Sequence, residues 1–114
     1  MPTRYYIRLP DPAGARGDDP DLAFGAHGAE TFAAELQRAL REDALFQRWR
    51  MKQDDPDEVD PVLGATDPAA TVIGMQDDLH VDLVAVTALP SAILRHRLAM
   101  LAGHRWELRD VTAA

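Results

Sequence analysis

The sequence has 114 residues, 46% of them apolar, and a formal net charge of −7 at pH 7, which fits one domain with a single hydrophobic core. It has no cysteine, which excludes disulfides, thiolate metal sites and cysteine nucleophiles. No apolar run approaches the roughly 18 residues of a membrane span, and the first ten residues lack the apolar region of a signal peptide. We therefore expect a single domain over residues 1–114, located in the cytoplasm, without membrane contact.

The acidic residues are concentrated in two proline-containing segments, at about 10–28 and 53–70. The first holds four aspartates against Arg16, and the second holds five aspartates and Glu58 with no base. Proline and aspartate favour turns over regular secondary structure, so both segments are predicted to be long loops. Because like charges in a row repel, we expect the second loop to be solvated and mobile rather than a calcium site.

In the first half of the chain, residues 3–9 alternate between apolar and polar side chains, which predicts a strand with one buried face. Residues 29–41 carry apolar side chains at helical spacing, and Gly28 suits the position before the first turn. The segment 45–52 is ambiguous. A continuous helix would place polar side chains on the apolar stripe, so we favour a strand there.

The second half begins with a hairpin. Residues 71–75 are β-rich with Gly74 as a candidate bulge, 76–78 form the turn, and 79–86 form the second strand. A helix then runs from Pro90 to Gly103, both of which suit helix ends. The last predicted strand covers 105–111, with Trp106 and Leu108 inward.

This order predicts an α+β domain of the ferredoxin-like type, β-α-β-β-α-β, with a possible extra strand at 45–52. One antiparallel sheet would carry two helices on one face and leave the other face open. Right-handed connections place the first strand beside the last. Since this fold carries many unrelated functions, the function depends on specific sites.

The open face of the sheet is the first candidate site. The predicted topology places Arg4, Tyr6 and Arg8 beside Arg105 and Arg109, which makes a face rich in arginine with one aromatic ring. One interpretation is a solvated polar face with cross-strand ion pairs. The other is a binding surface for a protein partner or for a second copy of the chain. Single-stranded nucleic acid is disfavoured, because the net charge is negative and phosphate contacts provide much of that affinity.

The second candidate is an apolar cleft between sheet and helices, lined by Trp49, His80, Asp82 and Trp106. It would make the protein a small enzyme that needs no cofactor, an alternative based on analogy with the fold. The four histidines lie on separate segments, so no metal site is predicted, and His96, between two arginines, is expected to face solvent. The leading prediction is a small non-catalytic protein-binding or adaptor module that forms a homo-oligomer through the open face.

Overall fold

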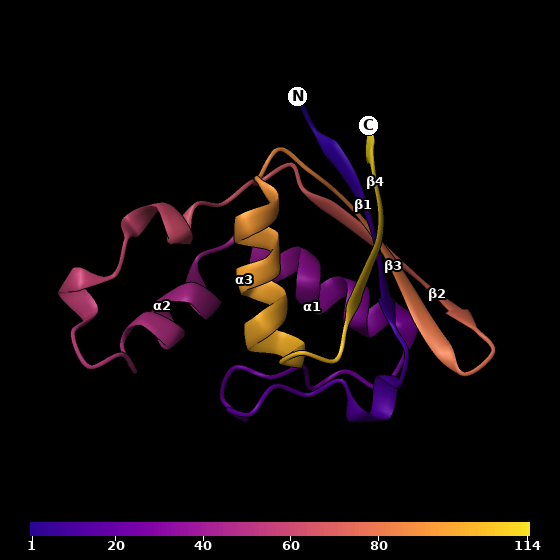
Figure 1. Cartoon of the computed structure of the whole chain (residues 1–114), viewed down its shortest axis with the longest axis horizontal. Coiled ribbons are helices and arrows are strands. Elements are labelled where there is room, and N and C mark those ends of the chain that lie inside the picture. Colours follow the sequence, from indigo (N-terminus) through magenta and orange to yellow (C-terminus); the bar gives the residue numbers. More distant parts are fainter.

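The computed structural model describes residues 1–114 and contains one four-stranded sheet and three α-helices (Figure 1). The strands are β1 (Thr3–Leu9), β2 (Thr71–Asp77), β3 (His80–Thr87) and β4 (Glu107–Ala113). The helices are α1 (Ala29–Arg41), α2 (Ala44–Arg50) and α3 (Ser91–Ala102). Short 3-10 turns occupy Pro12–Gly14, Pro56–Glu58 and Pro61–Gly64. None of the helices combines the length and apolar character needed to cross a membrane.

The strands pair antiparallel throughout, in the order β2-β3-β1-β4. The predicted α+β class and the single antiparallel sheet are therefore confirmed, and the first strand lies beside the last. Side chains alternate along the two central strands, and one set is fully in the core: Tyr5, Ile7, Leu9, Val81, Leu83, Ala85 and Thr87. This alternation leaves the other side of the sheet as an open face.

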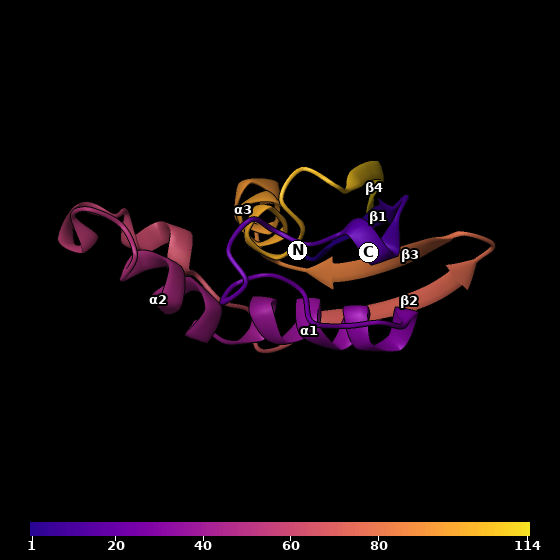
Figure 2. The same cartoon turned by 90° about the horizontal axis from the view of Figure 1, so that it is seen from below.

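The buried face packs against α1 and α3, whose apolar side chains belong to the same hydrophobic cluster as those of β1 and β3. Helix α1 lies along β2 (Figure 2). Gly74 makes this approach possible, because a Cβ there would lie 2.2 Å from the backbone oxygen of Ala29. The suggested bulge at Gly74 is wrong, since the residue pairs in regular register with Leu83. The glycine instead admits the backbone of the helix.

The segment predicted as a strand at 45–52 is helix α2, so the chain has three helices rather than two. Helix α1 ends at Arg41, and Glu42 has extended backbone angles of φ −126° and ψ 155°. The prediction failed because it tested 45–52 as a continuation of α1. The extended residue Glu42 interrupts the helix, so the apolar positions of α2 have to be counted separately. Counted from the start of α2, the side chains turned toward the core have helical spacing: Leu45, Phe46 and Trp49.

Arg97, in the middle of α3, is the largest fully buried side chain of the protein. Its guanidinium donates hydrogen bonds to the backbone oxygens of Ala39 at 3.1 Å, Leu63 at 2.6 Å and Ala65 at 2.9 Å. It also lies over the ring of Phe46, 5.5 Å from the centroid. Burial lowers the pKa of Arg97. One side chain thus joins two helices to the second acidic segment.

Arginine side chains donate hydrogen bonds to the backbone of the second acidic segment near its start and at its end, while its acidic side chains between Asp54 and Asp60 are exposed, in line with the predicted solvated loop. Near its start, Arg50 donates from Nε to the backbone oxygen of Pro56 at 3.0 Å. At its end, Arg41 donates from Nε to the backbone oxygen of Ala70 at 2.6 Å. These arginines donate to carbonyl oxygens of the segment, and Arg50 also lies 3.5 Å from a carboxylate oxygen of Asp57. The backbone is held while most of the acidic side chains stay exposed.

The first acidic segment is held in a similar way. Arg16 donates to the backbone oxygen of Phe24 at 2.8 Å, and Phe24 itself is buried in the core. Lys52, the single lysine of the sequence, lies 2.8 Å from a carboxylate oxygen of Asp19 and 2.7 Å from one of Asp21. This pair of contacts joins the first segment to the residue that precedes the second.

The hairpin and the last strand are shifted from their predicted positions. The turn between β2 and β3 is formed by Asp78 and Leu79, and Asp78 has a φ of 56°, in the left-handed region that aspartate tolerates. Leu79, predicted to begin the second strand, is part of this turn and is 81% exposed. As a consequence, Asp77 and His80 are directly opposite each other in the sheet.

Candidate functional site

Three cross-strand rows of side chains make up the open face of the sheet. From β2 to β4, the first row is Thr71, Val86, Arg4 and Thr112. The middle row is Ile73, Val84, Tyr6 and Asp110. The third row is Met75, Asp82, Arg8 and Glu107, and Asp77 with His80 continues the face at the hairpin.

An apolar strip runs through this face, made of Tyr6, Ile73, Met75, Val84 and Val86. Ile73 is 60% exposed and Met75 is 49% exposed, so β2 presents two large apolar side chains to solvent. Single exposed apolar residues are common on protein surfaces, whereas neighbouring ones rimmed by polar groups are typical of binding surfaces. The strip lies next to the unpaired edge of β2, which is the first strand of the sheet.

A hollow of about 270 Å³ opens on the same face. Tyr6, Met75 and Val84 of the apolar strip line it, together with Arg8 and Asp82. Its volume lies just below the range of about 300–1,000 Å³ that is usual for small-molecule sites. The hollow is therefore better matched to an inserted side chain than to a complete small ligand.

The predicted arginines of this face have different positions. Arg4 and Arg8 lie on it, but Arg8 donates from Nε to Asp82 at 2.9 Å, which lowers the pKa of Asp82 and raises that of Arg8. Arg109 donates to Glu107 at 3.2 Å. Arg105 precedes β4, and its guanidinium lies beside Gly14, against the first acidic segment. The open face thus carries both signs of charge and is not generally basic.

Searches of protein-family models, of curated proteins and of solved structures find no match to this chain. The chemistry of the open face and of the hairpin beside it is therefore the basis for assigning a function.

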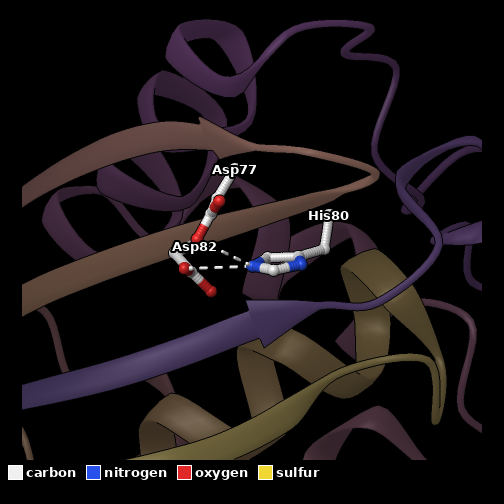
Figure 3. Close-up of side chains that lie close together, drawn as sticks. All are labelled: Asp77, His80 and Asp82. Atoms are coloured by element: carbon white, nitrogen blue, oxygen red, sulfur yellow. Dashed lines mark ion pairs between the residues drawn. The ribbon is translucent and has the colours of Figure 1, made fainter.

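At the hairpin end of the face, Asp77, His80 and Asp82 bring their side chains together (Figure 3). Nε2 of His80 lies 3.5 Å from Oδ2 of Asp77 and 3.3 Å from Oδ2 of Asp82. The sequence indicated His80 and Asp82 on one strand face, but it missed Asp77, because the predicted turn at 76–78 removed that residue from the strand. The two-residue turn at 78–79 is what makes Asp77 the partner of His80.

The predicted cleft residues Trp49, His80, Asp82 and Trp106 do not meet at one site. Trp49, on α2, packs edge-on against His96 of α3, with ring centroids 4.4 Å apart. Trp106 donates from Nε1 to the backbone oxygen of Gly103 at 2.9 Å. The hollow that Trp49 lines contains neither His80 nor Asp82, and the hollow that Asp82 lines contains no tryptophan.

His96 is half-buried rather than solvent-facing, which corrects its predicted position. Its Nδ1 is shielded from solvent and has no hydrogen-bond partner, and burial lowers its pKa. The ring fills space between α2 and α3 as an aromatic packing group. His96 packs against Phe46 and Trp49 of α2, and we assign it a structural role.

Proposed function

We propose that this chain is a non-catalytic binding module that pairs with a second copy of itself through the open face of the sheet. The observation that carries the proposal is the apolar strip, in which Ile73 and Met75 of the edge strand β2 are exposed. Covering such side chains releases about 25 cal/mol for each Å² of apolar surface removed from water. The shallow hollow beside Tyr6 supports the same conclusion, since it can receive a side chain from the facing sheet.

The charges of the face favour a second copy as the occupant. Arg4 is the only charged residue in its row, whereas the opposite end holds Asp77, Asp82 and Glu107 against Arg8 and Arg109. A two-fold axis that runs across the strands through the middle row turns one end of the face over the other. In such a pair, Arg4 of each copy lies over the row of the other copy in which Asp82 and Glu107 stand on either side of Arg8, and the two apolar strips meet.

The size of the face determines how strong this pairing is. Strands about 4.8 Å apart, rising about 3.3 Å per residue over roughly seven residues, give four strands a projected area of about 440 Å². Stable complexes bury about 800 Å² on each partner, and weak, transient ones bury less. We therefore expect a reversible dimer with a dissociation constant in the micromolar range.

The architecture is consistent with this proposal. The order β2-β3-β1-β4, with α1 and α3 as the two connections, supports a ferredoxin-like sandwich in which α2 is an added helix. The helices occupy one side of such a sandwich and leave the other side free for pairing.

The test is the molecular mass in solution over a concentration series from micromolar to millimolar, by sedimentation equilibrium. The wild-type chain should change from monomer to dimer, and Ile73→Glu should stay monomeric, because it replaces the most exposed side chain of the strip with a charge. Val62→Glu is the matched control, since Val62 is 64% exposed but lies in the Pro61–Gly64 turn. A wild-type monomer at every concentration, or an Ile73→Glu variant that dimerises as the wild type does, overturns the proposal.

A further inference from the structure

The hairpin between β2 and β3 carries a second feature that the proposed pairing does not use. Nε2 of His80 is shielded from solvent, and it points between the carboxylates of Asp77 and Asp82 (Figure 3). Both oxygens lie within 3.5 Å, yet neither contact has the geometry of a hydrogen bond, so the nitrogen has no partner. An imidazole nitrogen that points between two carboxylates has the arrangement of a metal site with three protein ligands, one nitrogen and two oxygens.

We propose that Asp77, His80 and Asp82 form a binding site for a divalent transition-metal ion, with Zn²⁺ as the best-matched example. Bonds of about 2.0–2.2 Å in a tetrahedral arrangement separate neighbouring ligand atoms by about 3.3–3.6 Å. The separations of 3.3 and 3.5 Å between the imidazole nitrogen and the two oxygens agree with this geometry. All three ligand atoms lie within 4.8 Å of one another, so one ion can reach them together.

The surroundings of the three residues support the assignment. Arg8 donates from Nε to Oδ1 of Asp82 at 2.9 Å and, more weakly, from Nη2 to Oδ2 at 3.4 Å, which orients that carboxylate with Oδ2 toward His80. Hydrogen bonds of this kind to the ligands are a general feature of metal sites in proteins. Gln76 donates to the backbone oxygens of Asp78 at 2.9 Å and His80 at 3.1 Å, and so fixes the turn on which two of the ligands stand.

The ligand types narrow the choice of metal. An imidazole with two carboxylates suits zinc and related transition ions, whereas calcium takes six to eight oxygens and magnesium keeps several waters. Three protein ligands leave a fourth tetrahedral position open. Because the Asp77 side chain is 68% exposed, this position faces solvent and is available to water or to a donor group of a bound molecule.

The test measures Zn²⁺ binding by isothermal titration calorimetry, at a protein concentration low enough to keep the chain monomeric, so that the result does not depend on dimer formation. The wild-type chain should bind one Zn²⁺, and Asp77→Asn and His80→Asn should each weaken binding at least about tenfold. His104→Asn is the control, because His104 is exposed on the turn before β4. It should bind as the wild type does.

Replacement of Zn²⁺ by Co²⁺ provides a second readout, since a tetrahedral cobalt site has intense visible absorption, which His80→Asn should abolish. Asp77→Asn keeps the test decisive if His80→Asn does not fold, because the Asp77 side chain is 68% exposed and its one ion pair is with His80. The proposal is overturned if the wild type binds no Zn²⁺, or if Asp77→Asn binds it with unchanged affinity. It is also overturned if His104→Asn loses binding to the same extent.

Discussion

Arg97 on α3 donates a hydrogen bond from Nε to the backbone oxygen of Ala39 on α1, at 3.1 Å, although the two residues are 58 positions apart in the sequence. The other guanidinium nitrogens reach two carbonyl oxygens of the second acidic segment. A buried charge without such partners costs far more than it contributes. Here three carbonyl acceptors and an aromatic ring replace the water that the guanidinium loses.

Replacing Arg97 with methionine should destabilise the fold by about 3 kcal/mol, because three carbonyl oxygens lose their donor. Arg97→Lys should not restore the loss, since one ammonium group cannot copy a planar fork of donors. The comparison variant is Arg95→Met, which removes only a stacking contact with Trp106 and should cost about 1 kcal/mol or less. Urea unfolding measures both, and equal losses in the two methionine variants would contradict the role of Arg97.

The close approach of α1 to β2 predicts a second sensitive position. Gly74→Ala places a methyl group 2.2 Å from the backbone oxygen of Ala29, so the helix has to move away from the strand. Overpacking of this kind costs about 1–3 kcal/mol. Gly25→Ala serves as control, because the nearest atom would be at 3.6 Å, an ordinary contact distance. Equal midpoints of thermal unfolding for the two variants would contradict the conclusion that the close approach of α1 to β2 requires glycine at position 74.

Asp67 predicts how stability changes with pH. Its carboxylate accepts hydrogen bonds from the N–H of Ala88 and the hydroxyl of Thr87, which lowers its pKa. A carboxyl group with a lowered pKa stabilises the fold above its unfolded pKa, about 3.9, and this contribution is lost as the pH falls through the folded value.

Asp67→Asn should therefore be less stable than the wild type at neutral pH, by about 1 kcal/mol. The difference should shrink as the pH falls below about 4, where the carboxyl of the unfolded wild-type chain takes up a proton before that of the folded chain. Unfolding by urea at a series of pH values measures the two curves. The pKa values of Asp19 and Asp82 are also lowered, so the variant keeps part of the acid sensitivity. Curves that stay parallel down to the lowest pH would contradict the assignment.

The proposed two-fold pairing makes a charge-specific prediction. Arg4→Glu places a carboxylate over the acidic end of the other copy, so the dissociation constant of the dimer should rise at least about tenfold, and added salt should reduce this difference. Arg48→Glu makes the same change in charge on the exposed side of α2 and should leave association unchanged. Both variants are compared with the wild type by sedimentation. Equal weakening in both would mean that only net charge matters.

The strands and helices whose apolar residues recur at one clear spacing could be predicted from the sequence. Strand β1 and helix α1 have the predicted bounds, because strict alternation and i+4 spacing each allow a single interpretation. Helix α2 could not be predicted, since a two-residue break resets the helical phase without any glycine or proline to mark it. The spacing of Arg97 agrees with its burial, because it is four residues from Ile93 and three from Leu94 on the buried side of α3. It was not predicted to be in the core because arginine is charged.

For the candidate sites, too, the arrangement within one strand could be predicted, whereas the pairing between strands could not. The alternation of β1 placed Arg4, Tyr6 and Arg8 on one face, as the register requires. Their partners on other strands depend on register, which a shift of one or two residues changes completely. The shift of the hairpin turn is the reason why Asp77 was missed, and the later start of β4 is the reason why Arg105 lies elsewhere.

Lys52 gives the protein a single side-chain amine, and that amine is held by Asp19 and Asp21. Hydrogen bonds to these two carboxylates raise the pKa of Lys52, so little of it is in the neutral, nucleophilic form. Acylation removes the positive charge and with it both ion pairs. An amine-specific reagent, scored by mass spectrometry at this one position, therefore reports how often the two acidic segments separate, without any engineered label.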